Sequence, residues 1–137
     1  TFMTQEEKEL LLKDLCARLP YGVKFLRKSW NYECDQELSV IEVLEDIDKD
    51  GYINNTKVYT VEDIKPYLRP MSSMTEEESK EYTNIDNRSY SCPTDYAHIP
   101  ASDRIDWLLK NHFDYRGLIP KGLAIEVTEE NNPYQLD

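Results

Sequence analysis

The fold class of this chain depends on one stretch, LSVIEVLEDI, which runs from Leu38 to Ile47. Its apolar residues fit a helical stripe poorly and a strand with two apolar faces fairly well. Three of them, Val40, Ile41 and Val43, are branched at Cβ, which restricts χ1 in a helix and suits the pleated surface of a sheet. We therefore expect a β-strand here.

Strands on both sides of this stretch are predicted to complete a small sheet. The sequence Asp48-Lys49-Asp50-Gly51 predicts a turn directly after it, because Asp-Gly is a strong hairpin signal. Residues 21–31 have strand character, and short strands at 52–54 and 57–60 are expected to return after the turn. Residues 21–60 are thus predicted to form antiparallel strands.

A helix is predicted in front of the sheet, at residues 4–19. Thr4 and Glu7 form a T-x-x-E capping box, in which each side chain accepts a hydrogen bond from the backbone N–H of the other residue. Leucines recur behind this box at helical spacing. Pro20 ends the helix, because proline has no backbone N–H to continue it.

The second half of the chain predicts helices, turns and one more strand. Residues 61–82 have the pattern of short helices and a linker. Residues 84–100 are rich in Asn, Asp, Ser and Pro, as long loops are. Within residues 102–137 we expect, in order, a helix at 102–112, a turn at 113–119 and a final strand at 123–127.

These elements predict a single α+β domain over residues 1–137. An N-terminal helix and two further helices would pack on a small twisted antiparallel sheet, with a half-open barrel as an alternative form of that sheet. One of the further helices begins at a second capping box, formed by Thr75 and Glu78, and is expected to end near Tyr82.

The charge of the chain argues against two classes of partner. Among its 137 residues, 39% hydrophobic and 31% charged, 16 basic and 27 acidic side chains give a net charge of −11. Nucleic acid requires clustered Lys and Arg at its phosphates, and anionic membrane surfaces also attract basic segments. No apolar run approaches the length of a membrane span and no leader pattern precedes the first helix, so we expect a cytoplasmic protein.

One stretch has the spacing of a calcium-binding loop. Asp46, Asp48 and Asp50 occupy the first three ligand positions of an EF-hand loop, and Tyr52 stands where such a loop donates a carbonyl oxygen. The last position needs a bidentate Glu and holds Lys57, which removes two oxygen ligands and adds a positive charge. We expect an acidic hairpin turn without a metal, and keep a divalent-cation (calcium) binding module as the first alternative.

Candidate catalytic residues are few. His98 lies in the predicted loop and His112 at a helix end, and a small enzyme that uses either of them is the second alternative. No P-loop, G-x-S-x-G or G-x-G-x-x-G motif occurs, and the three cysteines match neither a disulfide framework nor a zinc site. We therefore assign no catalytic residue, no metal ligand and no cofactor.

Three blocks of the sequence resemble known proteins. They are KDLCARLPYGVK at 13–24, IKPYLRPMSSMTEEE at 64–78 and FDYRGLI at 113–119. These blocks resemble a group of small proteins of gut-bacterial genomes and of their mobile elements and phages, which carries no established activity. The resemblance implies a cytoplasmic protein of a bacterium or its phage.

The expected function is that of a non-enzymatic interaction or accessory protein. Ten tyrosines and two tryptophans are explained either by aromatic packing in the core or by a protein-binding surface, where these residues are enriched. The expected partner is another protein, and the chain itself is expected to be a monomer or a homodimer.

Overall fold

The computed structural model describes residues 3–31, 33–57, 59–91 and 101–134. Its elements follow the order α1 (Gln5–Arg18), η1 (Leu19–Tyr21), β1 (Lys24–Asn31), β2 (Gln36–Val43), η2 (Val61–Asp63), β3 (Ile64–Pro70), η3 (Met71–Ser73), α2 (Glu76–Ser91), α3 (Ala101–Lys110), β4 (Phe113–Asp114) and β5 (Ile125–Glu126). The predicted α+β class, with an N-terminal helix beside a small sheet, is confirmed.

The predicted cap of the first helix is present. The Thr4 hydroxyl accepts a hydrogen bond of 3.1 Å from the backbone N–H of Glu7, and the Glu7 carboxylate accepts one of 2.9 Å from that of Thr4. The helix ends at Arg18, and Gly22 then turns the chain with a left-handed φ of 66° into β1. The chain therefore enters the sheet after only the short η1 that follows α1.

The sheet is mixed, whereas the sequence predicted an antiparallel one. Its strand order is β2-β1-β3-β4, and β5 also pairs with β3. β1 is antiparallel to both β2 and β3, but β4 and β5 are parallel to β3. The sheet is not closed into a barrel: along this order β2 forms one edge and β4 the other. Parallel pairs need a long crossover connection, which local sequence patterns do not reveal.

The segment at 61–70 differs from its prediction as short helices and linker. Only η2, which Thr60 caps, is helical, and the chain then continues as β3. In β3, Ile64 and Leu68 are 2% and 0% exposed and join the core that α1 covers. Burial against α1 and pairing with β1 therefore outweigh the local helical preference.

The returning strands predicted at 52–54 and 57–60 are reduced to two isolated bridges. Ile47 pairs with Ile53, and Tyr52 pairs with Thr60. Asn54, Asn55 and Lys57 all adopt left-handed φ values, which interrupt an extended strand. This segment is a connecting loop between β2 and β3; residue 58 lies outside the described residues.

The long loop predicted at 84–100 is wrong over its first half. α2 begins behind the Thr75–Glu78 capping box and continues to Ser91, past the predicted end near Tyr82. The Tyr82 ring packs on Trp107 of α3, with 5.5 Å between ring centroids. This contact supports a helix whose own residues show little apolar periodicity, while 92–100 lie outside the described residues.

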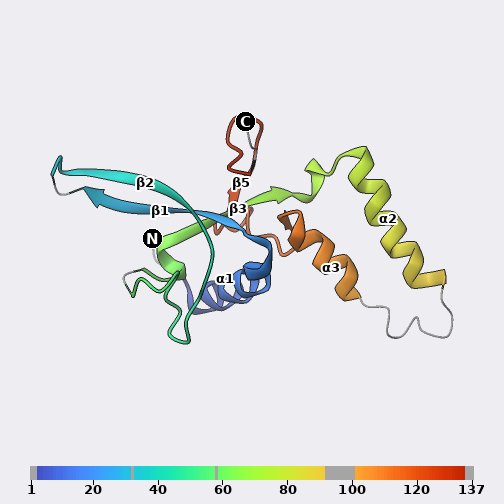
Figure 1. Ribbon diagram of the computed structural model, residues 1–137, viewed down its shortest axis with the longest axis horizontal. Helices are drawn as coiled ribbons and strands as arrows, with labels where there is room; N and C mark the ends of the chain where they lie inside the picture. The colour runs from blue at the N-terminus through green and yellow to red at the C-terminus, as the bar shows by residue number, and fades with distance from the viewer. Residues whose placement is uncertain (1–2, 32, 58, 92–100, 135–137) are drawn as a thin grey trace.

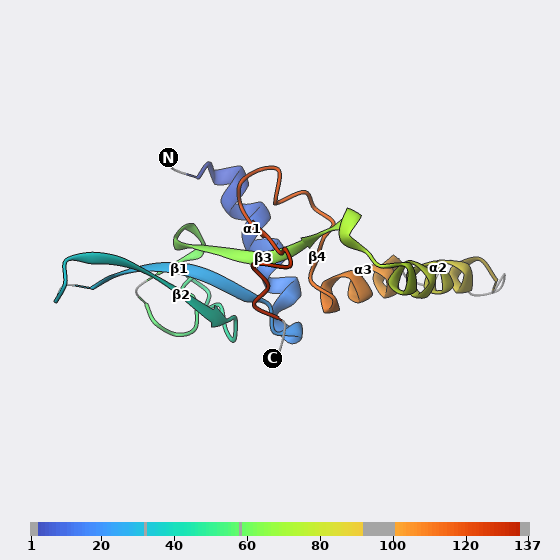
Figure 2. The ribbon, with the colours of Figure 1, turned by 90° about the horizontal axis from the view of Figure 1, so that it is seen from above.

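The core lies between α1 and one face of the sheet (Figure 1). It contains Leu11, Leu15, Val23, Phe25, Leu44, Ile53, Val61, Ile64, Leu68, Leu118, Leu123 and Ala124. A second cluster of Trp107, Leu108 and Phe113 lies where α3 leads into β4. The β1–β2 ribbon and the α2–α3 pair extend from opposite ends of this body (Figures 1 and 2).

Candidate functional site

A two-stranded ribbon projects from the body of the protein. We call it the arm; it consists of β1, β2 and the turn at residues 33–35, which are described between them. Only Phe25, Leu26 and Arg27 of β1 also pair with β3. Both views show that the rest of the arm extends beyond the sheet and away from the helices (Figures 1 and 2).

Strand β2 exposes a group of large apolar side chains. Leu38, Ile41 and Val43 are 42%, 48% and 39% exposed. Among the residues whose side chains the structure describes, Met71 is the other large hydrophobic side chain that is exposed. The pattern that predicted a strand with two apolar faces therefore belongs to a strand whose side chains are largely in water.

The outer edge of β2 has backbone groups that face away from β1. The N–H of Leu44 donates to the carbonyl of Val23 over 2.8 Å, which fixes the phase of the antiparallel ladder. Because residues along such a strand alternate between its two neighbours, Glu37, Ser39 and Ile41 turn their N–H and C=O groups outward. In the described parts of the chain, no strand is paired with this edge.

The base of this edge is closed by a side chain. The amide Nδ2 of Asn54 donates to the carbonyl of Val43 over 2.9 Å, and its Oδ1 accepts from the backbone N–H groups of Glu45 and Asp46. For the outward-facing groups of Glu37, Ser39 and Ile41, the described part of the chain provides no such cover. The free edge therefore comprises Glu37, Ser39 and Ile41.

The carboxylates of β2 are paired within the arm. Arg27 donates to Glu42 over 2.9 Å, and the Tyr59 hydroxyl donates to the same carboxylate over 2.9 Å. The hydrogen bond from Arg27 lowers the pKa of Glu42. Lys28 lies 3.4 Å from Glu37. Each acidic group of β2 thus has a basic neighbour on β1, in a chain that is strongly acidic as a whole.

The apolar surface of the arm continues towards the sheet. Leu26 lies opposite Ile41 in the β1–β2 ladder, so both side chains are on the same face. A hollow of about 460 Å³ begins at Leu26 and is lined further by Ile64, Lys65 and Ile125. Glu62 and Asp63 also line this hollow, so it offers a partner apolar contacts and charges of both signs.

The carboxylates named for the alternative calcium module are not arranged as a metal site. The Oδ1 atom of Asp48 accepts hydrogen bonds of 2.9 Å from the backbone N–H groups of Asp50 and Tyr52, as in an Asx-type turn. Among the described residues, no group of three or more His, Cys, Asp or Glu side chains, Asp46, Asp48 and Asp50 included, is arranged to hold a metal ion. The loop therefore serves to turn the chain.

Of the two histidines, only His112 lies within the described residues; His98 lies outside them. The ring of His112 stacks on the ring of Tyr134, with 3.8 Å between ring centroids. Burial, together with the charges of Arg18, Arg69 and Lys24, lowers its pKa to about 4. The imidazole is neutral at pH 7 and its Nδ1 is buried without a hydrogen-bond partner.

The hollow beside His112 is lined by neither a Ser nor a Cys side chain. It measures about 530 Å³ and is lined by Arg69, Lys110, Asn111, His112, Asn132 and Tyr134. Glu78 neutralises Arg69 through hydrogen bonds of 2.6 and 2.7 Å, which lower the pKa of Glu78 to about 2. No Ser, Cys or carboxylate is among these lining residues, so the hollow does not provide a Ser–His or Cys–His pair.

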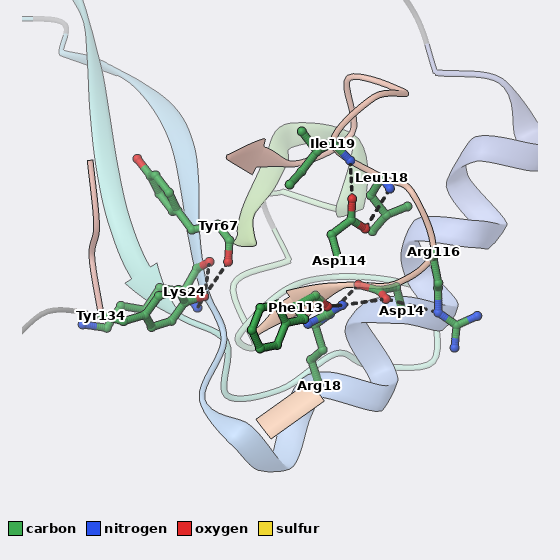
Figure 3. Close-up of polar contacts among 10 residues, drawn as sticks. All are labelled: Asp14, Arg18, Lys24, Tyr67, Phe113, Asp114, Arg116, Leu118, Ile119 and Tyr134. Atoms are coloured by element: carbon green, nitrogen blue, oxygen red, sulfur yellow. Dashed lines mark hydrogen bonds and ion pairs between the residues drawn. The ribbon is translucent and has the colours of Figure 1, made fainter. Parts of the chain in front are cut away.

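Two polar anchors were missed from the sequence. Tyr134, which follows the predicted final strand, donates to the carbonyl of Tyr67 and accepts from the N–H of Lys24 (Figure 3). Asp14 and Arg18 form a fully buried ion pair of 2.6 Å on α1 (Figure 3). The i,i+4 spacing of Asp14 and Arg18 on the predicted helix was a sequence signal for the ion pair. No local sequence signal pointed to the role of Tyr134.

Comparison of the chain with protein-family models, with curated proteins and with solved structures finds no match. Among the described residues, no helix is both long and apolar enough to cross a lipid bilayer.

Proposed function

We propose that this chain is a non-enzymatic interaction protein that docks on a partner protein through the arm. One observation carries the proposal: β2 combines exposed Leu38, Ile41 and Val43 with a backbone edge that no other described strand covers. An added strand would bind main-chain groups along this edge and cover the apolar side chains at the same time.

The composition of β2 supports this function. Monomeric proteins protect free edges with Lys, Pro or bulges, because unpaired edges lead to association. Strand β2 has the sequence QELSVIEV at residues 36–43, which contains neither Lys nor Pro. Its ladder with β1 is continuous, so it has no bulge. An edge without these protective features is suited to docking.

The other parts of the proposal come from the sequence. The resemblance of three sequence blocks supports a bacterial or phage origin and a cytoplasmic location, and the charge of −11 supports a protein rather than a nucleic acid or a membrane as the partner. The calcium and enzyme alternatives gain no support from the geometry around Asp48 and His112.

Site-specific photo-crosslinking tests the proposal. A photoreactive side chain is placed at Ile41 and, as a matched control, at Met71, which is exposed to a similar extent on η3. Each variant is irradiated in a bacterial lysate and its adducts are separated by mass. We expect discrete protein adducts from position 41 that are absent from position 71.

A competition experiment completes this test. Ile41→Lys introduces a charge at an exposed position and should leave the fold intact, so unlabelled wild-type chain should compete for the adducts whereas the Ile41→Lys chain should not. Equal adduct patterns at positions 41 and 71, or equal competition by both chains, would contradict a docking role for the arm.

A further inference from the structure

We propose that the strand that covers the edge of β2 is β2 of a second copy of this chain, in an antiparallel pair whose two-fold axis passes through Ser39. This inference rests on the proposed function of the arm and names its partner. The result would be a C2 dimer in which the two ribbons form one continuous four-stranded sheet.

The backbone of the free edge fixes the register of this pair. A ladder must match outward-facing residues of one strand with outward-facing residues of the other, and these are Glu37, Ser39 and Ile41. Only the register centred on Ser39 pairs these three residues of one chain with the same three residues of the other. In it, Ser39 faces Ser39 of the second chain, and Glu37 faces Ile41 of the second chain.

Neighbouring registers are less favourable. With the two-fold axis at Val40, Glu37 would have to pair with Val43 of the second copy. The carbonyl of Val43 already accepts a hydrogen bond from Asn54. Moving the axis to Leu38 would place Ile41 opposite Asp35, which lies in the turn with a left-handed φ of 52° and not in the strand. The register at Ser39 avoids both problems.

The side chains agree with the same register. Leu38 of one copy would lie opposite Val40 of the other, which forms an apolar cross-strand pair on each side of the axis. Glu37 would lie opposite Ile41, so no two like charges face each other. Since Lys28 and Arg27 already pair with Glu37 and Glu42, two acidic chains can approach along this edge without facing unpaired carboxylates.

The other sheet edges are less suited to this role. The part of β1 beyond its pairing with β3 begins with Lys28, a basic residue of the kind that protects edges. β4, at the opposite end of the sheet, is only two residues long. The arm, in contrast, extends away from the body, so two arms can overlap while α1, α2 and α3 stay apart (Figures 1 and 2).

Disulfide trapping tests the register. The experiment uses the full chain with Cys16, Cys34 and Cys92 replaced by serine, into which Ser39→Cys or Glu37→Cys is introduced. At a hydrogen-bonded antiparallel pair the Cα atoms are about 5.5 Å apart, which is within disulfide range. Two residues at position 37 would be about 13 Å apart along the strand, since each faces position 41 of the other copy.

We expect mild oxidation to convert most of the Ser39→Cys chain to a covalent dimer and to leave the Glu37→Cys chain monomeric. Sedimentation equilibrium should show a concentration-dependent dimer for the wild type. Ser39→Lys should abolish that dimer by placing two cations opposite each other, whereas Ser79→Lys, at an exposed position of α2, should not.

Equal trapping at positions 39 and 37, or a wild-type chain that stays monomeric, would overturn the inference. The photo-crosslinks at Ile41 separate this failure from failure of the proposed function. If their adducts contain a different protein and no second copy, the arm docks on a foreign partner: the dimer is then wrong and the docking function stands.

Discussion

The hydroxyl group of Tyr134 donates a hydrogen bond of 2.7 Å to the backbone carbonyl of Tyr67, 67 residues earlier in the chain (Figure 3). The same oxygen accepts a hydrogen bond of 2.9 Å from the backbone N–H of Lys24 at the base of the arm. Burial raises the pKa of Tyr134. One side chain near the C-terminal end thus joins β1 to β3 at the point where the arm leaves the sheet.

Replacing this anchor is expected to destabilise the fold. Tyr134→Phe keeps the ring and removes the hydroxyl, so two backbone groups lose this partner, and the free energy of unfolding should fall by about 1–2 kcal/mol. Urea denaturation measures the change. Tyr115→Phe is the matched control, because the Tyr115 hydroxyl is buried without a partner and its removal should cost little. Equal losses in both variants would contradict a role for the hydroxyl of Tyr134.

The buried ion pair on α1 is expected to be costly to break. Asp14 and Arg18 are fully buried, and Arg18 also donates to the carbonyl of Phe113 over 2.6 Å. Asp14→Ala leaves a buried guanidinium without its carboxylate and should lower the free energy of unfolding by about 3–5 kcal/mol.

Two further variants test this explanation. The double variant Asp14→Ala, Arg18→Met should lose less stability than Asp14→Ala alone, because only Arg116, which is partly exposed, is then left without the Asp14 carboxylate. Lys8→Ala, which breaks the half-exposed pair with Glu62, should change stability by less than about 1 kcal/mol. A double variant less stable than Asp14→Ala, measured by the same urea denaturation, would contradict the argument.

The stability of the protein is expected to depend on pH through His112. Its pKa is about 4 in the folded chain and 6.5 as an ordinary histidine, so between these values the unfolded chain binds a proton that the folded chain does not. The free energy of unfolding should therefore decrease as the pH falls through this range.

Urea denaturation at about pH 7 and about pH 5 measures this effect. His112→Asn should reduce the decrease in the free energy of unfolding between these two pH values, because asparagine does not titrate. Asparagine also tolerates the left-handed φ of 65° at this position. His98→Asn is the control for histidine replacement in general. An unchanged loss in His112→Asn would assign the pH dependence to other groups.

The loop at residues 46–54 is expected to be indifferent to calcium. A thermal melt with millimolar calcium and one with EDTA should coincide, because the Asp48 carboxylate accepts two backbone hydrogen bonds of its own turn and no ligand set is assembled there. Asp48→Ala should lower the melting temperature equally in both solutions. A calcium-dependent rise that disappears in Asp48→Ala would restore the calcium module.

Local patterns were sufficient where a segment's own atoms stabilise it. The Thr4–Glu7 capping box and the leucine spacing predicted α1, and the β-branched residues at 40–43 predicted β2. The turn at Asp48 was also predicted, because its hydrogen bonds stay within a few residues. These three predictions were enough for the α+β class.

Local patterns failed where distant partners decide the structure. Residues 64–70 form β3 because they pair with β1 and because Ile64 and Leu68 are buried in the core beside α1. The helix α2 continues past its predicted end, where Tyr82 packs on Trp107. The same holds for the candidate site. The sequence showed an apolar strand at 38–47 but not whether anything covers it.

The first helix, the β2 strand and the turn after it could be predicted from local sequence, because capping, Cβ branching and Asx geometry act over a few residues. The parallel pairing of β4 and β5 with β3, the anchoring of Tyr134 and the exposure of β2 could not, because they depend on contacts between distant segments. Burial, above all, depends on which segments meet in space. An apolar strand such as β2 has the same sequence pattern whether it is the centre of a core or the free edge of an arm.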